Sequence, residues 1–320
     1  MTQLPDQKLD QNSDPYHMDK ARVRASFDRA AVSYDAAAVL QAEVRARMFS
    51  RLDLIKIAPG AILDAGCGTG HASTELARRY ADSAVVSLDL APGMLKRAQA
   101  QQGFATKVKA MLGLGRQRRQ QFVCGDIEHL PLADASLGMM WSNLAVQWCN
   151  DLDLAFQEAY RVLQPEGLLM FSTFGPDTLR ELRQASTIST SQADAEAVHV
   201  SRFIDMHDIG DALVRAGFTA PVLDVERFVL TYDEVLDVMR DLKSIGAHNA
   251  AAGRSRGLQG RGFLMQLADN YEQFRQGKKE DGGKLPATFE VIYAHAWKPQ
   301  PKPYFEDGAV PMTFQPRKLA

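Results

Sequence analysis

A turn built from alternating glycines is the first feature of this sequence that could do chemistry. Gly66, Gly68 and Gly70 follow an apolar run and precede a helical pattern. A strand, a glycine turn and a helix start expose backbone N–H groups, which bind anions. The spacing differs from a dinucleotide fingerprint because His71 follows the third glycine directly, and Asp64 would repel a pyrophosphate. Asp64 would instead attract an ammonium group, so the turn predicts a ligand that carries both a carboxylate and an ammonium group.

Polar side chains also follow the next three predicted strands. Asp89, followed by Leu90, ends the second strand, where a carboxylate can accept hydrogen bonds from ribose hydroxyls. Asp126 follows the third strand and can accept from an adenine amine while Ile127 packs on the ring. Asn143 ends the fourth strand. Parallel strands place their carboxyl ends at one edge, so the combination predicts a site for S-adenosylmethionine, an amino acid joined to a nucleoside.

Strands and helices alternate along the chain, which is typical of an α/β protein. Short apolar runs predict strands at 61–65, 84–90, 121–124, 137–142, 167–173, 221–230 and 288–297. Apolar residues at helical spacing predict helices at 23–34, 40–52, 71–80, 94–101, 154–163, 206–216 and 232–242. The expected fold is a doubly wound, mostly parallel seven-stranded sheet preceded by N-terminal helices. We expect the last two strands to pair antiparallel at the sheet edge.

Composition divides the chain into a body and two tails. Residues 1–19 carry turn formers and charges without period, and residues 298–320 contain five prolines, so we expect flexible tails there. The body, 20–297, is expected to form one domain. Within it, residues 243–287 are rich in Gly, Arg and Gln with a short helical pattern at 263–274, and we expect an inserted helical cap.

The composition excludes several classes of protein. Lys and Arg number 37 against 39 Asp and Glu, so no global positive field recruits nucleic acid or a membrane surface. The three cysteines suit neither a disulfide framework nor a metal knuckle, and the seven histidines show no metal-ligand spacing, so we expect no metal. The first residues are polar and no apolar run reaches 18 residues. We therefore expect a soluble, cytoplasmic protein.

Longer stretches of the sequence add a family resemblance. Residues 62–70, ILDAGCGTG, and 125–132, GDIEHLPL, resemble class I S-adenosylmethionine-dependent methyltransferases. The stretches MMWSNLAVQWCNDL at 139–152 and VRASFDRAAVSYD at 23–35 narrow the resemblance. Over roughly 20–297 the chain resembles the malonyl-acyl carrier protein O-methyltransferases of biotin synthesis.

The resemblance implies an activity and further site residues. The expected reaction converts the free carboxylate of a malonyl thioester on acyl carrier protein to a methyl ester, with Tyr34 closing over the site. Because that carboxylate is already ionised at neutral pH, no general base is expected. We expect Arg202 to grip the carboxylate, although a surface ion pair with Asp205 is an equal alternative. Trp148 and Phe203 are expected to wall the thioester channel, although either ring could simply belong to the core.

A basic segment at 104–121 is the remaining candidate for contact with a partner. It carries five cations and no acid: Lys107, Lys109, Arg116, Arg118 and Arg119. Acyl carrier proteins are acidic, so the segment could dock one, or it could be a solvated excursion without a partner.

Two other functions stay open at this stage. The stretches FGPDTLRELR at 174–183 and LPATFEVIYAHAW at 285–297 also resemble a respiratory complex I assembly factor that hydroxylates an arginine of a partner subunit. The 139–152 stretch and the segment around Tyr34 favour methyl transfer over hydroxylation. The third possibility is a cofactor-binding scaffold without catalytic activity.

Overall fold

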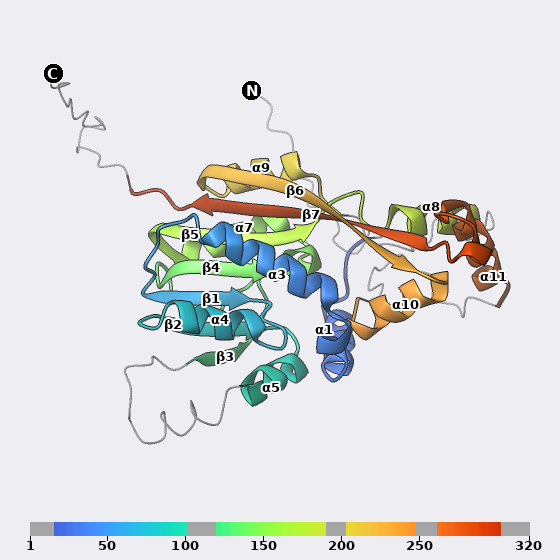
Figure 1. Cartoon of the computed structure of the whole chain (residues 1–320). Coiled ribbons are helices and arrows are strands. Elements are labelled where there is room, and N and C mark those ends of the chain that lie inside the picture. The colour runs from blue at the N-terminus through green and yellow to red at the C-terminus, as the bar shows by residue number, and fades with distance from the viewer. Residues whose placement is uncertain (1–15, 102–119, 190–202, 248–260, 302–320) are drawn as a thin grey trace, which may run out of the picture.

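A seven-stranded sheet forms the centre of the molecule (Figure 1). The computed structural model describes residues 16–101, 120–189, 203–247 and 261–301. The strands are β1 (Ala61–Ala65), β2 (Ala84–Asp89), β3 (Gln121–Cys124), β4 (Leu137–Asn143), β5 (Leu163–Phe174), β6 (Thr219–Tyr232) and β7 (Leu285–Trp297). They lie in the order β3-β2-β1-β4-β5-β7-β6. β1 to β5 pair in parallel, and β7 pairs antiparallel with both β5 and β6. The predicted fold class and the antiparallel pairing of the last two strands are confirmed.

Helices connect the strands and cover the sheet. Among the described residues, the helices with eight or more residues are α1 (Lys20–Ala30), α3 (Val39–Leu52), α4 (His71–Arg79), α5 (Pro92–Gln101), α7 (Leu152–Val162), α8 (Arg180–Ser189), α9 (Met206–Arg215), α10 (Val235–Ser244) and α11 (Arg261–Tyr271). The two caps that start α1 and α7 are aspartates, Asp19 and Asp151, whose carboxylates accept backbone N–H groups of the first turn. These caps begin both helices next to the carboxyl edge of the sheet.

Two apolar layers, one on each face of the sheet, form the core. β4 shows why both faces are covered, since every residue from Leu137 to Ser142 is buried. On one face α3 and α4 pack through side chains such as Met48 and Leu76, and on the other α7 and α9 pack through Phe156 and Leu213. The sheet is therefore rigid where its parallel strands end.

A helix that the sequence analysis missed, α8, packs against the region expected as an inserted cap. In Figure 1, α8, α10 and α11 gather around one end of β6 and β7. Glu181 of α8 accepts hydrogen bonds from the backbone and hydroxyl of Thr288. The hydroxyl of Tyr271, fully buried in α11, donates to the carbonyl of Pro286 at 2.9 Å. Thus α8, which precedes residue 243, packs with the predicted cap segment.

Several boundaries differ from the expected ones, and three of these differences concern the region of Tyr34 and the two ends of the body. The helix expected to contain Tyr34 ends at Ala30, and Tyr34 starts a separate short helix, α2 (Tyr34–Ala37). Met18, placed in the N-terminal tail, is buried and hydrogen-bonded to Asn150. Lys298, placed in the C-terminal tail, donates to two backbone carbonyls of the body. The wider division into one domain and two tails stays a prediction.

No helix among the described residues is both long enough and apolar enough to cross a membrane.

Candidate functional site

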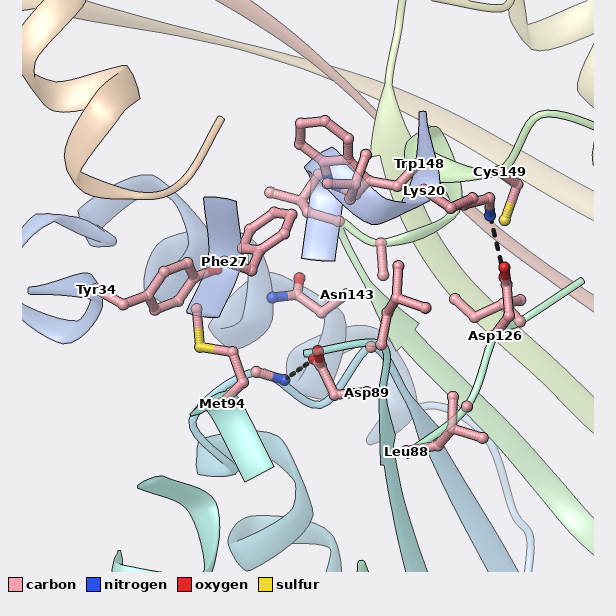
Figure 2. Close-up of a pocket in the computed structure, with 18 residues that line it drawn as sticks. Lys20, Phe27, Tyr34, Leu88, Asp89, Met94, Asp126, Asn143, Trp148 and Cys149 are labelled. Carbon is pink, nitrogen blue, oxygen red and sulfur yellow. Dashed lines mark hydrogen bonds and ion pairs between the residues drawn. The ribbon is translucent and has the colours of Figure 1, made fainter. Parts of the chain in front are cut away.

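A cavity lies at the carboxyl ends of β1, β2 and β4, beneath α1 (Figure 2). It encloses about 630 Å³, part of which is open to solvent. Predicted site residues from across the sequence line it: Tyr34, Gly66, Gly68, Asp89, Leu90, Asp126, Ile127, Asn143 and Trp148. The structure brings these residues together because parallel strands deliver their carboxyl ends to the same edge.

The glycine turn forms one wall of this cavity. Gly66 has a φ of +74°, and a Cβ on it would stand 2.2 Å from the Cβ of Ala145, so no side chain fits there. Gly68 has a φ of +54°, and a Cβ on it would meet only the ring of Tyr34, at 4.0 Å. The first glycine therefore allows close packing of two loops, while the second leaves space open in front of the turn.

Asp89 fixes the turn from the neighbouring strand. Its Oδ2 accepts the backbone N–H of Gly68 at 2.9 Å, and its Oδ1 accepts that of Ala91 at 2.8 Å. Each oxygen keeps a lone pair for another donor. Burial raises the pKa of Asp89 to about 6, against an ordinary value of 3.8. The carboxylate is thus oriented by the protein and ionised at neutral pH.

Asp126 is paired with a cation that the sequence analysis did not single out. Lys20 Nζ lies 3.0 Å from Asp126 Oδ1 (Figure 2). Lys20 also contacts Glu128, which is 5% exposed. Glu128 in turn accepts the backbone N–H groups of Asn150 and Asp151. Lys20 therefore joins α1 to the loop after β3 and to the loop before α7.

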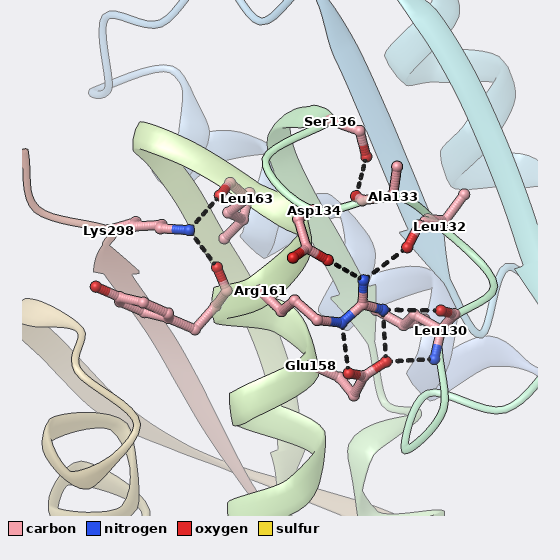
Figure 3. Close-up of polar contacts among 10 residues, drawn as sticks. Leu130, Leu132, Ala133, Asp134, Ser136, Glu158, Arg161, Leu163 and Lys298 are labelled. Carbon is pink, nitrogen blue, oxygen red and sulfur yellow. Dashed lines mark hydrogen bonds and ion pairs between the residues drawn. The ribbon is translucent and has the colours of Figure 1, made fainter.

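The loop that carries Asp126 is held in place by Arg161 of α7 (Figure 3). Its guanidinium donates to the carbonyls of Leu130 and Leu132 and pairs with Glu158 and Asp134. Because a guanidinium offers five donors in a fixed plane, one side chain fixes several points of the loop. This network sets the position of the polar groups after β3.

Aromatic rings close the cavity from above. Phe27 of α1 meets Trp148 edge-to-face with ring centroids 5.2 Å apart. Tyr34 lies beside them, and burial raises the pKa of its hydroxyl above the ordinary value, so this hydroxyl stays protonated at neutral pH. Asn143 donates to the carbonyl of Gln41 in α3 and accepts from Ser172. α1, α2 and α3 together thus roof the strand ends.

Asp64 and Gly70 lie outside the cavity wall. The Asp64 carboxylate, 1% exposed, accepts a hydrogen bond from the hydroxyl of Ser73 in α4, and burial raises its pKa to about 7. Gly70 starts α4 with a φ of +88°. In this structure Asp64 therefore faces the buried hydroxyl of Ser73 rather than the cavity expected to take an ammonium group.

The remaining predicted residues either line another cavity or lie outside the described part of the chain. Phe203 lines a second cavity beside it. Arg202 lies outside the described residues, as do Lys107, Lys109, Arg116, Arg118 and Arg119. Asp205, the alternative partner of Arg202, caps α9 and contacts His207.

Neither thiol near the site is activated. Burial raises the pKa of both Cys67 and Cys149 well above the ordinary range, so both stay protonated. Within the described ranges no cluster of His, Cys, Asp or Glu has an arrangement suited to a metal ion. Sequence reasoning missed Lys20 and Phe27 as residues of the cavity wall. The helical spacing of Phe27 is a signal that could have suggested its role, whereas the sequence carries no comparable signal for Lys20.

Comparison with known proteins places the chain. The sequence profile of the methyltransferase domain matches residues 63–171. A candidate methyltransferase from Bacillus halodurans shares the fold, with a TM-score of 0.54 and 19% identity over 80% of this chain and 99% of that one.

Two curated sequences are much closer. The malonyl-[acyl-carrier protein] O-methyltransferase of Methylovorus sp. is 63% identical and covers 95% of this chain and 98% of its own length. The protein of the same name from Laribacter hongkongensis is 53% identical, covering 96% of this chain and 100% of its own. At this identity and coverage, the chain belongs to the malonyl-[acyl-carrier protein] O-methyltransferase family.

Proposed function

We propose that this chain transfers a methyl group from S-adenosylmethionine to the free carboxylate of a malonyl thioester on acyl carrier protein. The product would be the malonyl methyl ester that starts biotin synthesis. The observation that carries the proposal is the meeting of Gly68, Asp89 and Asp126 in one cavity. The two curated relatives also support the proposal, because both carry the same name and each is matched over nearly its whole length.

The cavity suits S-adenosylmethionine in shape and in polar groups. The space in front of Gly68 would be narrowed by any side chain there. Asp89 would accept the ribose hydroxyls, since each of its oxygens has a lone pair left beyond the backbone contacts. Asp126, with Ile127 and Leu90, would hold the adenine. Gly66 and Asn143, which line the cavity, would support the amino-acid end. When bound, S-adenosylmethionine supplies an electrophilic methyl group on a positively charged sulfur.

The protein's share of the chemistry is alignment and exclusion of water. A malonyl carboxylate, with a pKa near or below about 3.9, is already ionised and nucleophilic at neutral pH, so no proton has to be removed from it. Tyr34, Cys67 and Cys149 stay protonated and are not bases in this reaction. The carboxylate oxygen forms a bond to the methyl carbon while the carbon–sulfur bond breaks and its electron pair stays on sulfur. Both charges disappear in this step, so a dry wall with Phe27 and Trp148 favours it.

Two parts of the proposal concern residues that the structure does not describe. Arg202 would select a carboxylated acyl chain through a bidentate contact, next to Phe203, which does line the second cavity. Lys107, Lys109, Arg116, Arg118 and Arg119 would meet the acidic carrier protein. Both contacts would add selectivity for the substrate without changing the affinity for the cofactor.

One experiment tests these points together. The protein is incubated with methyl-labelled S-adenosylmethionine and malonyl-acyl carrier protein, with acetyl-acyl carrier protein as control, and the product mass is measured. We expect label and one methyl group on the malonyl product only. An added oxygen would instead indicate hydroxylation, and no consumption of cofactor would indicate a scaffold without activity.

Kinetic measurements test the two substrate contacts. Arg202→Ala should raise KM or lower kcat, and added salt should lower kcat/KM. Unchanged kinetics of Arg202→Ala would remove the contact of Arg202 with the carboxylate from the proposal, and kinetics that do not change with salt would remove the contact of the basic segment with the carrier protein.

A further inference from the structure

A second cavity lies beside the first one. It encloses about 910 Å³, again partly open to solvent. The short 3-10 helix η1 (Val146–Trp148) separates the two, since Trp148 lines the first cavity while Val146 and Gln147 line the second, and Cys149 lines both. A ligand in the second cavity would therefore reach the neighbourhood of a ligand in the first one.

The lining of this cavity suits a long ligand segment without charge. Phe171 and Phe174 come from the end of β5, and Phe203 packs edge-to-face on Phe174 with centroids 5.6 Å apart. Among the described lining residues there is no Lys, Arg, Asp or Glu. Tyr16 and Ile204 are 40% and 41% exposed, so the mouth is open to solvent near them. A slender ligand could enter there without burying a charge in the cavity.

Gln147 is a polar group of this wall whose amide is held at both ends, as that of Asn150 is by the backbone of Met18. Its Nε2 donates to the carbonyl of Leu144 at 2.7 Å, and its Oε1 accepts from the hydroxyl of Thr173 at 3.4 Å. Thr173 is 5% exposed. These contacts fix which way the amide points and use one of its two N–H bonds. The remaining N–H is a neutral donor for a carbonyl of a ligand.

We propose that the second cavity holds the acyl thioester arm of the substrate and that Gln147 hydrogen-bonds a carbonyl of that arm. This inference rests on the proposed methyl transfer and names the subsite for its acyl substrate. A neutral donor on the arm positions the malonyl group without neutralising the carboxylate that must attack. Gln147 is thus a binding and positioning residue, and its loss changes the affinity for the acyl substrate and leaves the affinity for the cofactor unchanged.

The test compares Gln147→Leu with Gln157→Leu, a control on the exposed side of α7. Steady-state kinetics are measured with malonyl-acyl carrier protein, and the dissociation constant of S-adenosylhomocysteine is measured separately. For Gln147→Leu we expect KM to rise about 3- to 10-fold, the range for one neutral hydrogen bond, with S-adenosylhomocysteine binding unchanged. Thr173→Val, which frees the amide, should raise KM by a smaller factor. Thermal unfolding of each variant checks that it is folded.

The outcomes separate this inference from the proposed function. If the wild-type protein methylates malonyl-acyl carrier protein and Gln147→Leu leaves KM unchanged, the subsite assignment is wrong and the function stands. An equal loss of S-adenosylhomocysteine affinity would place Gln147 in the cofactor site and also overturn the assignment. If the wild-type protein transfers no methyl group, the proposed function fails. Equilibrium binding of labelled malonyl-acyl carrier protein to both proteins then decides the subsite, and equal affinities reject it.

Discussion

At the scale of single residues, the site depends on two carboxylates with different partners, a buried one at Asp64 and a partly exposed one at Asp89. Asp89 accepts two backbone N–H groups and faces the cavity, whereas Asp64 accepts a hydroxyl in the interior. Burial raises the pKa of Asp89 to about 6 and that of Asp64 to about 7. Because folded Asp89 holds its proton more tightly than an unfolded carboxyl, its contribution to stability is greatest in acid and is lost as the pH rises through 6. The affinity for a ligand depends on pH in the opposite direction and rises with pH, because the ionised carboxylate of Asp89 is the better hydrogen-bond acceptor.

We predict that S-adenosylhomocysteine binding weakens as the pH falls below about 6, by up to ~10-fold per pH unit. Isothermal titration calorimetry between pH 5 and 8 measures this effect. Asp89→Asn should weaken binding at neutral pH by about tenfold or more and remove the step near pH 6, because a neutral amide does not titrate. A wild-type affinity that stays constant down to pH 5 would contradict the assigned role of Asp89.

The site residues at the strand ends could be predicted from the sequence, whereas the residues that contact them from distant parts of the chain could not. Asp89, Asp126 and Asn143 each follow an apolar run, so the parallel fold alone places them at one edge. Lys20 and Gln147 act through contacts with distant residues, at sequence separations of 106 from Asp126 and 26 from Thr173. Local patterns contain no signal for such pairs.

At the scale of elements, α1 is a lid that polar contacts fasten to the rest of the site. Lys20 pairs with Asp126 and Glu128 at its first residue, and Asp28 accepts the backbone N–H of Gly93 in α5 at 2.6 Å further along. Just before α1, the backbone of Met18 exchanges two hydrogen bonds with the side chain of Asn150. The lid therefore bridges three separate segments around the cavity.

We predict that Lys20→Met loosens this lid. Burial lowers the pKa of Lys20, but its neighbours Cys149, Glu128 and Asp126 outweigh this effect and raise the pKa above its ordinary value, so Lys20 stays charged. Its removal leaves Glu128 buried without its cation. The affinity for S-adenosylhomocysteine should fall about tenfold, and thermolysin should cut the N-terminal segment faster. Arg22→Met is the matched control, because Arg22 is exposed and pairs only with Asp19 among the described residues. Equal behaviour of the two variants would mean that α1 is not a lid held by Lys20.

At the scale of the whole molecule, β7 joins the parallel sheet to its outer strand. Ile292 lies beside Thr173 of β5 on one side and Val225 of β6 on the other, and it is 1% exposed. The alternation of strands and helices indicated the parallel part of the sheet. This alternation could not show that β7 lies between β5 and β6, because the position of an antiparallel strand depends on which strand edge is free when it pairs.

We predict that Ile292→Ala lowers the free energy of unfolding by about 2–5 kcal/mol, the usual cost of a cavity at a fully buried aliphatic side chain. Val229→Ala on β6, 52% exposed, should change it by less than about 0.5 kcal/mol. Urea denaturation followed by circular dichroism measures both values. Similar losses for the two variants would show that β7 is not the strand on which the outer sheet depends.

The late position of β7 in the chain also sets an order of assembly during synthesis. The ribosome has released every strand that frames the first cavity, β1 to β4, long before residue 285 emerges. Until then β5 and β6 each present an unpaired edge, which is a template for association between nascent chains. The described residues that line the two cavities all precede residue 210, so both linings are synthesised before β7 enters between β5 and β6. A growing chain therefore needs protection from association at these two strand edges until its last strand has paired.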